Sequence, residues 1–259
     1  MPEGDTIRSA ANRVGAALIG RAIESIETPH PRFGKDHWPE KLAGRDVRAV
    51  DAHGKHLMLR FEGGLTIHSH LRMTGAWGVY SRGKRWHRGS HRAWLVIRTA
   101  EHDVVQFDGP VLELMTDGRT RLDPRIAQLG PDVLAEQFDG GEFLRRLRQD
   151  DPGRSLGDAL LDQRIVAGIG NIWKAEGCFR AQIDPWRRIR DVSDDEAVAV
   201  IEAVRPPMQE SAESGFPKSE TLRVYKRAGT PCPRCGSKIL ARGQGDDNRT
   251  TYWCPGCQS

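Results

Sequence analysis

Apolar side chains recur at three- and four-residue steps over the first twenty positions of the chain. This spacing places them on one face of a helix, and the residues concerned are Ile7, Ala11, Val14 and Leu18. Gly20 is a typical helix stop. We therefore expect an amphipathic helix that covers a larger apolar surface.

From about Ile23 to Met115 the pattern changes to short runs that predict strands. Large apolar residues occupy every second position of the run 56–61, and Gly63-Gly64 predicts a turn before the next run at 65–67. Further strands are expected at 94–98, 104–107 and 111–115. One helix followed by many strands favours a β-sandwich or barrel with the helix packed on it.

Beyond about residue 123 the spacing becomes helical again. Helices are expected at 143–147, 156–167, 172–179 and 194–205, and Pro206-Pro207 should interrupt the last of them. The tail from about residue 226 is rich in Cys, Gly and Arg. The sequence thus predicts an α+β fold class, with an N-terminal helix plus β-sandwich (1–130), a helical domain (131–225) and a separate tail domain (226–259).

The composition fits a folded protein with real cores. Of the 259 residues 38% are hydrophobic and 29% are charged, which excludes global disorder. No apolar stretch approaches the ~18 residues that span a bilayer, and the start MPEGDTIR lacks the features of a secretory signal. We expect a protein of the cytoplasm with no membrane partner.

Charge is concentrated in one segment of a chain whose net charge is only +4. Between His53 and Arg98 nine Lys and Arg residues face a single acid, Glu62. Trp77, Trp86 and Trp94 are interleaved with these cations, a mixture typical of nucleic-acid surfaces. A solvated face of the sheet is the other interpretation, and the segment alone does not decide between them.

Four of the five cysteines form two Cys-x2-Cys pairs near the C-terminus. The pairs, Cys232/Cys235 and Cys254/Cys257, are separated by 18 residues, which is a spacing typical of a four-cysteine zinc site. Disulfides are the alternative, but they are rare in intracellular proteins. Segments 237–241 and 249–253 can pair as a hairpin between the two Cys pairs. We expect one structural Zn²⁺, whose binding supplies the folding energy of the tail. Cys178 is expected to be buried on a helix.

Two further segments offer chemistry, although each also has a plain structural interpretation. Gly168 and Gly170 flank Ile169 in a tight turn, after which Asn171 is placed to cap a helix whose N-terminus favours a phosphate. An ordinary helix hairpin would look the same. At the start, removal of Met1 would expose the secondary amine of Pro2, a nucleophile beside the carboxylate of Glu3. A capped helix start is the alternative there.

Together these features resemble the formamidopyrimidine-DNA glycosylase / endonuclease VIII family of bifunctional DNA repair glycosylases. The resemblance covers essentially the whole chain. It rests on four motifs in the same order, which are Pro2-Glu3-Gly4, Gly54-Lys55-His56-Leu57, Gln163 to Gly177 as a helix–two-turns–helix, and Asn248 to Cys257 as a zinc finger.

The resemblance implies a base-excision repair enzyme that acts on damaged double-stranded DNA as a monomer, associated with the nucleoid. It implies roles for individual residues, of which Pro2 is the nucleophile that forms a Schiff base, Glu3 the acid/base partner, and Lys55 a phosphate contact that assists catalysis. Asn171 and Arg249 would grip phosphates beside the lesion, with Gln163 and Gly170 in the DNA-binding turn. Met73, next to Arg72, would fill the gap left by a flipped base.

Three departures from the family pattern bear on the substrate. The second acid near the start is the shorter Asp5, and the Arg-Phe pair of the formamidopyrimidine branch is replaced by Phe107-Asp108-Gly109-Pro110-Val111. The long loop before the zinc finger is reduced to 214–227. With PEG rather than PEL at the start, these differences favour the endonuclease VIII-like branch, oxidised pyrimidines, and strand cleavage by β,δ-elimination.

Three other functions are compatible with part of this pattern. An 8-oxoguanine or formamidopyrimidine glycosylase of the same family differs only in substrate. A non-catalytic DNA-damage-binding zinc-finger protein would not need a free Pro2. A zinc-ribbon protein of transcription or RNA binding would leave the PEGD start and the Gln163 turn unexplained.

Overall fold

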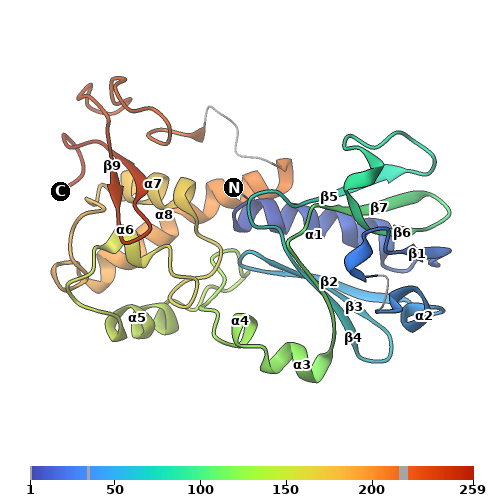
Figure 1. Cartoon of the computed structure of the whole chain (residues 1–259). Coiled ribbons are helices and arrows are strands. Elements are labelled where there is room, and N and C mark those ends of the chain that lie inside the picture. Colours follow the sequence, from blue (N-terminus) through green and yellow to red (C-terminus); the bar gives the residue numbers. More distant parts are fainter. Residues whose placement is uncertain (1, 34–35, 216–220) are drawn as a thin grey trace. The chain divides into compact units, whose positions relative to one another are not determined.

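The computed structural model describes residues 2–33, 36–215 and 221–259, and the chain divides into two compact units (Figure 1). The N-terminal unit comprises Met1–Pro2 and Thr6–Ala127, and the C-terminal unit comprises Glu3–Asp5 and Gln128–Ser259. The first residues of the opening helix therefore belong with the second half of the chain. The division into three domains at residues 130 and 225 stays a prediction.

The N-terminal unit is built from one long helix and two antiparallel four-stranded sheets. Helix α1 (Gly4–Leu18) ends just before Gly20, whose φ of 70° is left-handed. The strand orders are β1-β6-β7-β5 and β2-β3-β4-β8. The strands are β1 (Ser25–Glu27), β2 (Val47–His53), β3 (His56–Phe61), β4 (Leu65–His70), β5 (Ala76–Ser81), β6 (Ala93–Arg98), β7 (His102–Phe107) and β8 (Val111–Thr116).

A single apolar core joins α1 to both sheets. It contains Val14 and Leu18 from the helix, Leu57 and Ile67 from one sheet, and Ile97 from the other, all at most 1% exposed. Burial of this shared surface is what makes the two sheets a sandwich rather than separate layers. The β-sandwich prediction is confirmed, and so is the amphipathic helix.

The strands end where the sequence supplies turn residues. Gly63 and Gly64, both with φ of 74°, join β3 to β4 in the predicted turn. Short helices that the pattern did not predict follow at α2 (Trp38–Leu42), α3 (Asp117–Leu122) and α4 (Pro124–Ala127), and 3-10 turns lie at Pro31–Phe33 and Ser90–Arg92. Helix α3 packs against β4 and β8, so the residues of β3 and β4 on that side of the sheet are buried too.

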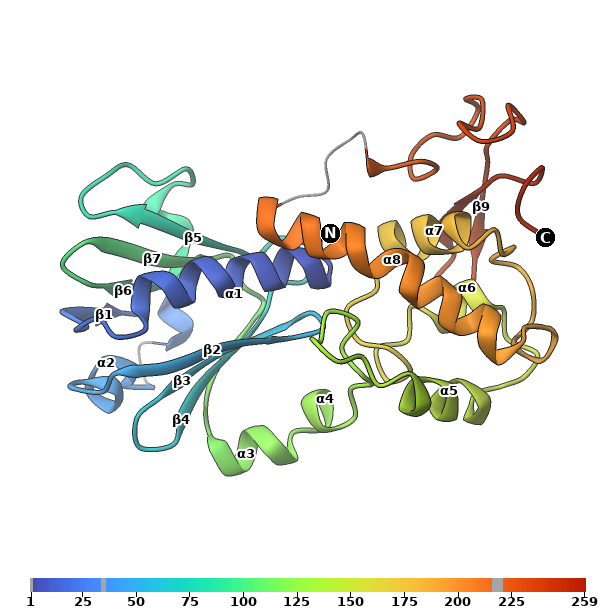
Figure 2. The same cartoon turned by 180° about the vertical axis from the view of Figure 1, so that it is seen from behind.

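The C-terminal unit is helical and carries a two-stranded hairpin. Its helices are α5 (Gly140–Gln149), α6 (Leu156–Ala159), α7 (Asn171–Arg180) and α8 (Asp194–Ser214), with a 3-10 turn at Ile189–Asp191. Helices α7 and α8 lie side by side (Figure 2). The hairpin consists of β9 (Leu240–Gln244) and β10 (Arg249–Trp253). This arrangement confirms the α+β fold class.

Two helix predictions were wrong in extent. Helix α8 continues through Pro206 and Pro207 to Ser214, because Val204, Met208 and Ala212 bury one continuous face on both sides of the prolines. The predicted helix 156–167 shrinks to α6, after which the chain turns. The first hairpin strand begins at Leu240 rather than at 237. No helix among the described residues is both long and apolar enough to cross a membrane.

Candidate functional site

Glu3 is buried, and its carboxylate closes the N-terminus of α7. Its Oε1 accepts a hydrogen bond from the N–H of Ile172 at 2.8 Å, and its Oε2 accepts from Gly170 at 3.0 Å and Trp173 at 3.3 Å. Only 2% of Glu3 is exposed. The orphan N–H groups and the positive end of the helix dipole both favour a carboxylate there. The residue that follows Pro2 is therefore fixed in position by a helix more than 160 positions further along the chain.

This arrangement corrects the prediction that Asn171 caps α7. The N-cap residue is Gly170, which has no side chain to bond, and the amide of Asn171 instead donates to the carbonyl of Thr250 at 2.7 Å. A carboxylate that is distant in sequence has taken the cap, a partnership that no local pattern reveals. Asn171 thereby connects the start of α7 to strand β10.

Gly170 is required by space rather than by backbone conformation. Its φ is −122°, which any residue adopts, but a Cβ on it would lie 2.3 Å from Cδ of Glu3. Gly4 shows the same closeness, since its N–H donates to the carbonyl of Gly168 at 2.9 Å and its Cβ would lie 2.8 Å from Cα of Gly168. Because Gly4 and Gly170 lack side chains, the start of helix α1 and Glu3 can lie directly against the turn 168–170.

Gln163 shapes the same turn with all of its polar atoms. Its Nε2 donates to the carbonyls of Leu161 and Ile169, and its Oε1 accepts from the N–H of Gly168 at 3.0 Å. Gly168 has a φ of 105°, a conformation that favours glycine. The glutamine that the family motif assigns to DNA binding thus holds the backbone of the turn.

Asp5 is buried against α8. It is 1% exposed, and its Oδ2 accepts a hydrogen bond from the hydroxyl of Ser211. Its Oδ1 has no hydrogen-bond partner among the described residues. The short side chain that departs from the family pattern therefore bonds to one serine of the neighbouring helix.

The candidate residues of the N-terminal unit lie at strand ends. Lys55 follows Gly54, whose φ is 55°, in the turn between β2 and β3. Arg72 has a left-handed φ of 49° in the connection from β4 to β5, and Met73 at the tip is 69% exposed. The exposed side chain of Met73 is accessible to a partner molecule, and its role as a wedge stays a prediction.

Three histidines on β3 and β4 form a cluster that the sequence analysis missed. Nδ1 of His56 lies 2.8 Å from Nε2 of His68, and the rings of His56 and His70 meet edge to face. Burial lowers the pKa of His56 to about 2 and the pKa values of His68 and His70 to about 4. The antiparallel register pairs His56 with His70, a contact that the alternation in His68-Ser69-His70 could have suggested.

The basic segment is less exposed and less basic than its sequence indicates. Among the residues that the structure describes, at least five of its nine cations form ion pairs with acids of other strands and turns, and these are Arg60, Arg82, Arg88, Arg92 and Arg98. Trp77 is only 6% exposed and donates to Ser69, while Trp94 packs on Phe33 and His30. These contacts engage Trp77 and Trp94 within the protein.

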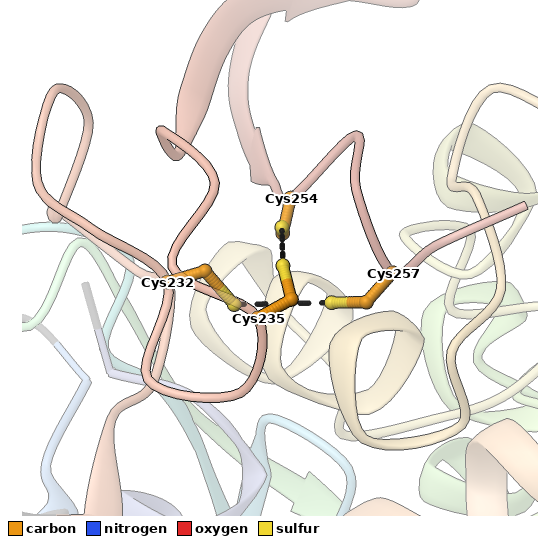
Figure 3. A group of neighbouring side chains, drawn as sticks. All are labelled: Cys232, Cys235, Cys254 and Cys257. Carbon is orange, nitrogen blue, oxygen red and sulfur yellow. Dashed lines mark hydrogen bonds between the residues drawn. The ribbon is translucent and has the colours of Figure 1, made fainter.

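The four C-terminal cysteines converge on one point (Figure 3). All four Sγ atoms lie within 4.8 Å of one another, with Cys235 and Cys254 3.4 Å apart and Cys232 and Cys257 3.8 Å apart. Four thiolates bound tetrahedrally at 2.3 Å to Zn²⁺ would stand about 3.8 Å apart. The donor set and its spacing fit a metal ion of this kind. Cys178 is fully buried on α7 as predicted, and burial raises the pKa of its thiol to about 12.

The hairpin beside the cysteines is tied to α7 by a buried polar network. Nζ of Lys174 contacts Oγ1 of Thr251 at 2.5 Å and Oε1 of Gln244 at 3.4 Å, and none of the three residues is more than 4% exposed. Arg249 opens β10, where its guanidinium pairs with Asp247 of the hairpin turn at 3.1 Å. The predicted location of Arg249, at the base of the turn, is thus the observed one.

Glu176 anchors the chain that leads into the cysteine-rich tail. Its buried carboxylate accepts hydrogen bonds from three consecutive N–H groups, those of Arg223, Val224 and Tyr225, at 2.9 to 3.0 Å. The connection 214–227, which the sequence shows to be short, therefore ends on backbone that Glu176 holds in place at 223–225. Its positions 216–220 lie outside the described residues.

Two domains of one known enzyme family match the chain. Residues 1–122 match the formamidopyrimidine-DNA glycosylase N-terminal domain, and residues 129–222 match the formamidopyrimidine-DNA glycosylase H2TH domain. The fold and these matches define an enzyme of the DNA glycosylase and AP lyase class. The protein belongs to the formamidopyrimidine-DNA glycosylase / endonuclease VIII family, as its motifs predicted.

Curated relatives span the whole chain. It is 40% identical to "Probable endonuclease 8 2" of Streptomyces coelicolor, covering 100% of this chain and 94% of that protein. It is 35% identical to "DNA-(apurinic or apyrimidinic site) lyase Nei2" of Mycolicibacterium smegmatis, covering 100% and 99%. Identity to the formamidopyrimidine-DNA glycosylase of Thermus thermophilus is 33%, covering 100% and 98%.

Solved structures share the fold. MutM in complex with DNA containing carbocyclic 8-oxo-G superposes with a TM-score of 0.84 at 24% identity, and each chain is covered completely. Lactococcus lactis Fpg in complex with DNA containing an N7-benzyl-Fapy-dG superposes with a TM-score of 0.83, also at 24% identity and complete coverage.

Proposed function

We propose that the protein removes oxidised pyrimidines from damaged double-stranded DNA and then cleaves the strand, with Pro2 as the nucleophile. Once Met1 is removed, the secondary amine of Pro2 attacks C1′ of the damaged nucleotide, and the base leaves with the electrons of the glycosidic bond. Glu3 then takes the proton from the nitrogen, whose lone pair forms an iminium with C1′ as the C1′–O4′ bond breaks, and the proton passes to O4′. Loss of a proton from C2′ expels the 3′-phosphate, and a second elimination expels the 5′-phosphate.

The observation that carries this proposal is the attachment of Glu3 to α7. A residue that transfers protons must be held within reach of the reacting atoms, and Glu3 directly follows Pro2 in the chain. Three backbone N–H groups fix its carboxylate. Glu3 is therefore suited to protonate the opening sugar ring and later to accept a proton. An ordinary capped helix start would need no glycine at position 170 to accommodate the glutamate.

The DNA contacts follow from the same family assignment. We assign phosphate contacts to Lys55, Arg72, Asn171 and Arg249, and we assign the wedge that replaces the flipped base to Met73, whose side chain is 69% exposed. Gln163 and Gly170 serve this surface by holding the turn before α7. Lys55 additionally assists catalysis.

The cysteine cluster would hold one structural Zn²⁺. Cys232, Cys235, Cys254 and Cys257 supply four sulfur ligands, which leave no open position for a reacting water. When bound, the ion supplies folding energy to the tail and no chemistry. The apolar contacts of the tail are shared with Ala175 and Phe179 of α7, so the metal and α7 together set the position of Arg249.

The substrate branch rests on the relatives and on the loop that follows β7. The two relatives that are 40% and 35% identical are named for endonuclease 8 and AP lyase activities. The stretch Phe107 to Val111, which matches the place of the Arg-Phe pair in the formamidopyrimidine branch, contains no arginine. The relative from Thermus thermophilus makes removal of 8-oxoguanine or formamidopyrimidine the second candidate. We further propose that the enzyme acts as a monomer in the cytoplasm, associated with the nucleoid.

Covalent trapping tests the mechanism. Borohydride should reduce the iminium and link the protein to duplexes that contain thymine glycol, dihydrouracil or an abasic site, and mass spectrometry of the peptides should place the adduct on Pro2. Glu3→Gln should lower trapping on the base lesions, whereas Glu213→Gln, at an exposed position of α8, should not. An adduct on another residue, or undiminished trapping by Pro2→Gly, contradicts the mechanism. Faster release of 8-oxoguanine than of either pyrimidine contradicts the substrate assignment alone.

A further inference from the structure

The loop that presents Met73 has little to stabilise it internally. It connects β4 to β5 through Leu71 to Gly75, and its one internal backbone bond runs from the N–H of Gly75 to the carbonyl of Leu71 at 2.9 Å. Arg72 is in the left-handed region, and Arg72, Met73 and Thr74 are all exposed. Whatever fixes the direction of Met73 must therefore come from neighbouring segments.

Thr74, directly after Met73, is held from two sides. Its Oγ1 donates to the backbone carbonyl of Asp108 at 3.2 Å, and its own carbonyl accepts from Nη1 of Arg88 at 2.7 Å. Asp108 follows β7, and Arg88 lies in the connection from β5 to β6. Two loops distant in sequence thus bond to the residue that follows the exposed methionine.

The carboxylate of Asp108 unites these contacts. It accepts from Nη1 of Arg88 at 2.9 Å and from Nη2 of Arg92 at 2.6 Å, while the N–H of Asp108 donates to the carbonyl of Arg92 at 3.1 Å. The side chain of Asp108 is only 21% exposed, and that of Arg88 is 31% exposed. Asp108 also has a left-handed φ of 46°, which aspartate tolerates better than most residues.

We propose that Asp108, acting through Arg88, is a positioning residue for Met73 and fixes the loop 71–75 against the force of base displacement. The inference rests on the proposed wedge role of Met73. Inserting an apolar side chain between bases costs a few kcal/mol in unstacking, and a loop free to bend would retreat instead. Hydrogen bonds between ionised partners are about twice as strong as neutral ones, so an arginine on a carboxylate suits this purpose.

The loop that carries Asp108 matches the place of the Arg-Phe pair in the formamidopyrimidine branch. The Arg-Phe pair of the formamidopyrimidine branch would put wedge side chains of its own on this loop. Here the residue turns its carboxylate back toward Arg88 and Arg92 and supports a wedge that stands on another loop. Met73 is then the wedge residue, and Asp108 and Arg88 hold its loop in position.

The test compares duplex DNA with single-stranded DNA, because only the duplex requires base displacement. Asp108→Asn keeps the shape of the side chain and removes its charge. We expect single-turnover excision of dihydrouracil from a duplex to fall about tenfold, the loss of one charge-assisted hydrogen bond, while excision from the same single strand stays unchanged. Arg88→Lys keeps the charge but replaces the guanidinium whose Nη1 donates to both Thr74 and Asp108, and it should show a smaller loss of the same kind.

The controls separate this inference from the proposal beneath it. Arg82→Gln breaks an ion pair with Asp103 near the start of the same connection, away from Thr74, and should leave the duplex-to-single-strand ratio at the wild-type value. Met73→Ala should lower that ratio. If it does not, the wedge role of Met73 is wrong. If Met73→Ala lowers the ratio and Asp108→Asn does not, or if Asp108→Asn slows both substrates equally, the positioning role is overturned.

Discussion

Nζ of Lys174 on α7 lies 2.5 Å from Oγ1 of Thr251 on β10, and neither residue is exposed to solvent. Oε1 of Gln244 accepts a hydrogen bond from the same hydroxyl at 2.6 Å, and its Nε2 donates to Ser155 and to the carbonyl of Pro185. One lysine therefore joins the helix that carries Asn171 to the strand that begins at Arg249. Burial lowers its pKa to about 8.

Replacement of this lysine should change how stability depends on pH. In the folded state the pKa is about 8, against 10.5 for an ordinary lysine. Between these values the unfolded chain holds a proton that the folded protein has released, so stability rises with pH by about 1 kcal/mol per unit. Lys174→Met removes this contribution. The wild type should therefore gain stability relative to the variant between pH 8 and pH 10, as measured by urea unfolding.

A surface lysine provides the matched control. Lys238→Met changes an exposed side chain and should follow the wild-type curve at every pH. Parallel curves for Lys174→Met and the wild type would show that the buried lysine does not release its proton in this range.

Gly170→Ala should inactivate the enzyme without unfolding it. The backbone conformation accepts alanine, but the new Cβ would lie 2.3 Å from Cδ of Glu3 and displace the carboxylate. We expect base excision to fall by roughly a hundredfold, the size of a lost general acid–base contribution, with the melting temperature changed by only a few degrees. Kinetics of excision on a thymine glycol duplex, with a melting curve, measure both effects.

Gly140→Ala is the control, since a Cβ at that position meets nothing within 4 Å. It should match the wild type in both measurements. Normal excision by Gly170→Ala would mean that the observed position of Glu3 is not needed for the reaction.

The buried histidines should make the N-terminal unit sensitive to acid. The pKa of His56 is lowered to about 2 and that of His68 to about 4, mainly by burial. An unfolded histidine binds its proton near pH 6.5, so the stability these neutral rings contribute is present above pH 6.5 and declines as the pH falls toward 4. Each buried ring should lower the free energy of unfolding by about 1 kcal/mol for every pH unit below 6.5 in this range.

His68→Gln should flatten this decline. The comparison is the free energy of unfolding at pH 7 and pH 5 for the wild type, for His68→Gln and for His87→Gln, which changes an exposed histidine. Besides His56, the ionisable groups near His68 are Arg125, Glu113 and Asp123, and all of them remain in the variants. An equal loss of stability in all three proteins would contradict an acid response centred on this pair.

Metal removal should release the tail and its arginine. We expect about one zinc per chain by elemental analysis, and Cys254→Ser should lower both the zinc content and the affinity for DNA. Structural zinc sites of this kind contribute on the order of 10 kcal/mol to folding, so partial retention of the tail fold is not expected. Cys178→Ala, which removes the buried thiol outside the cluster, should keep the metal. A zinc content unaffected by Cys254→Ser would contradict the assignment.

Local patterns carried much of the fold. The three- and four-residue spacing defined α1, the alternating runs and Gly63-Gly64 defined β3 and β4, and the two Cys pairs defined the metal cluster. Each of these features depends on residues close together in the sequence or on a ligand geometry with fixed spacing. The helix through Pro206 and Pro207 was missed because proline normally ends a helix, and the burial of Val204, Met208 and Ala212 that outweighs two missing N–H donors depends on the neighbouring elements.

The sequence by itself determined which chemical groups the protein has, namely a Pro-Glu start, a glycine turn, four metal ligands and an arginine beside a hairpin turn. Tertiary structure alone decided their partners. Glu3, not Asn171, caps α7, Asp108 binds two arginines that belong to a basic segment, and Lys174 bonds to neutral groups of the hairpin. The physical reason is that an orphan N–H or a buried charge is satisfied by whichever group the fold brings within 3 Å, and nearness in space is not encoded by nearness in sequence.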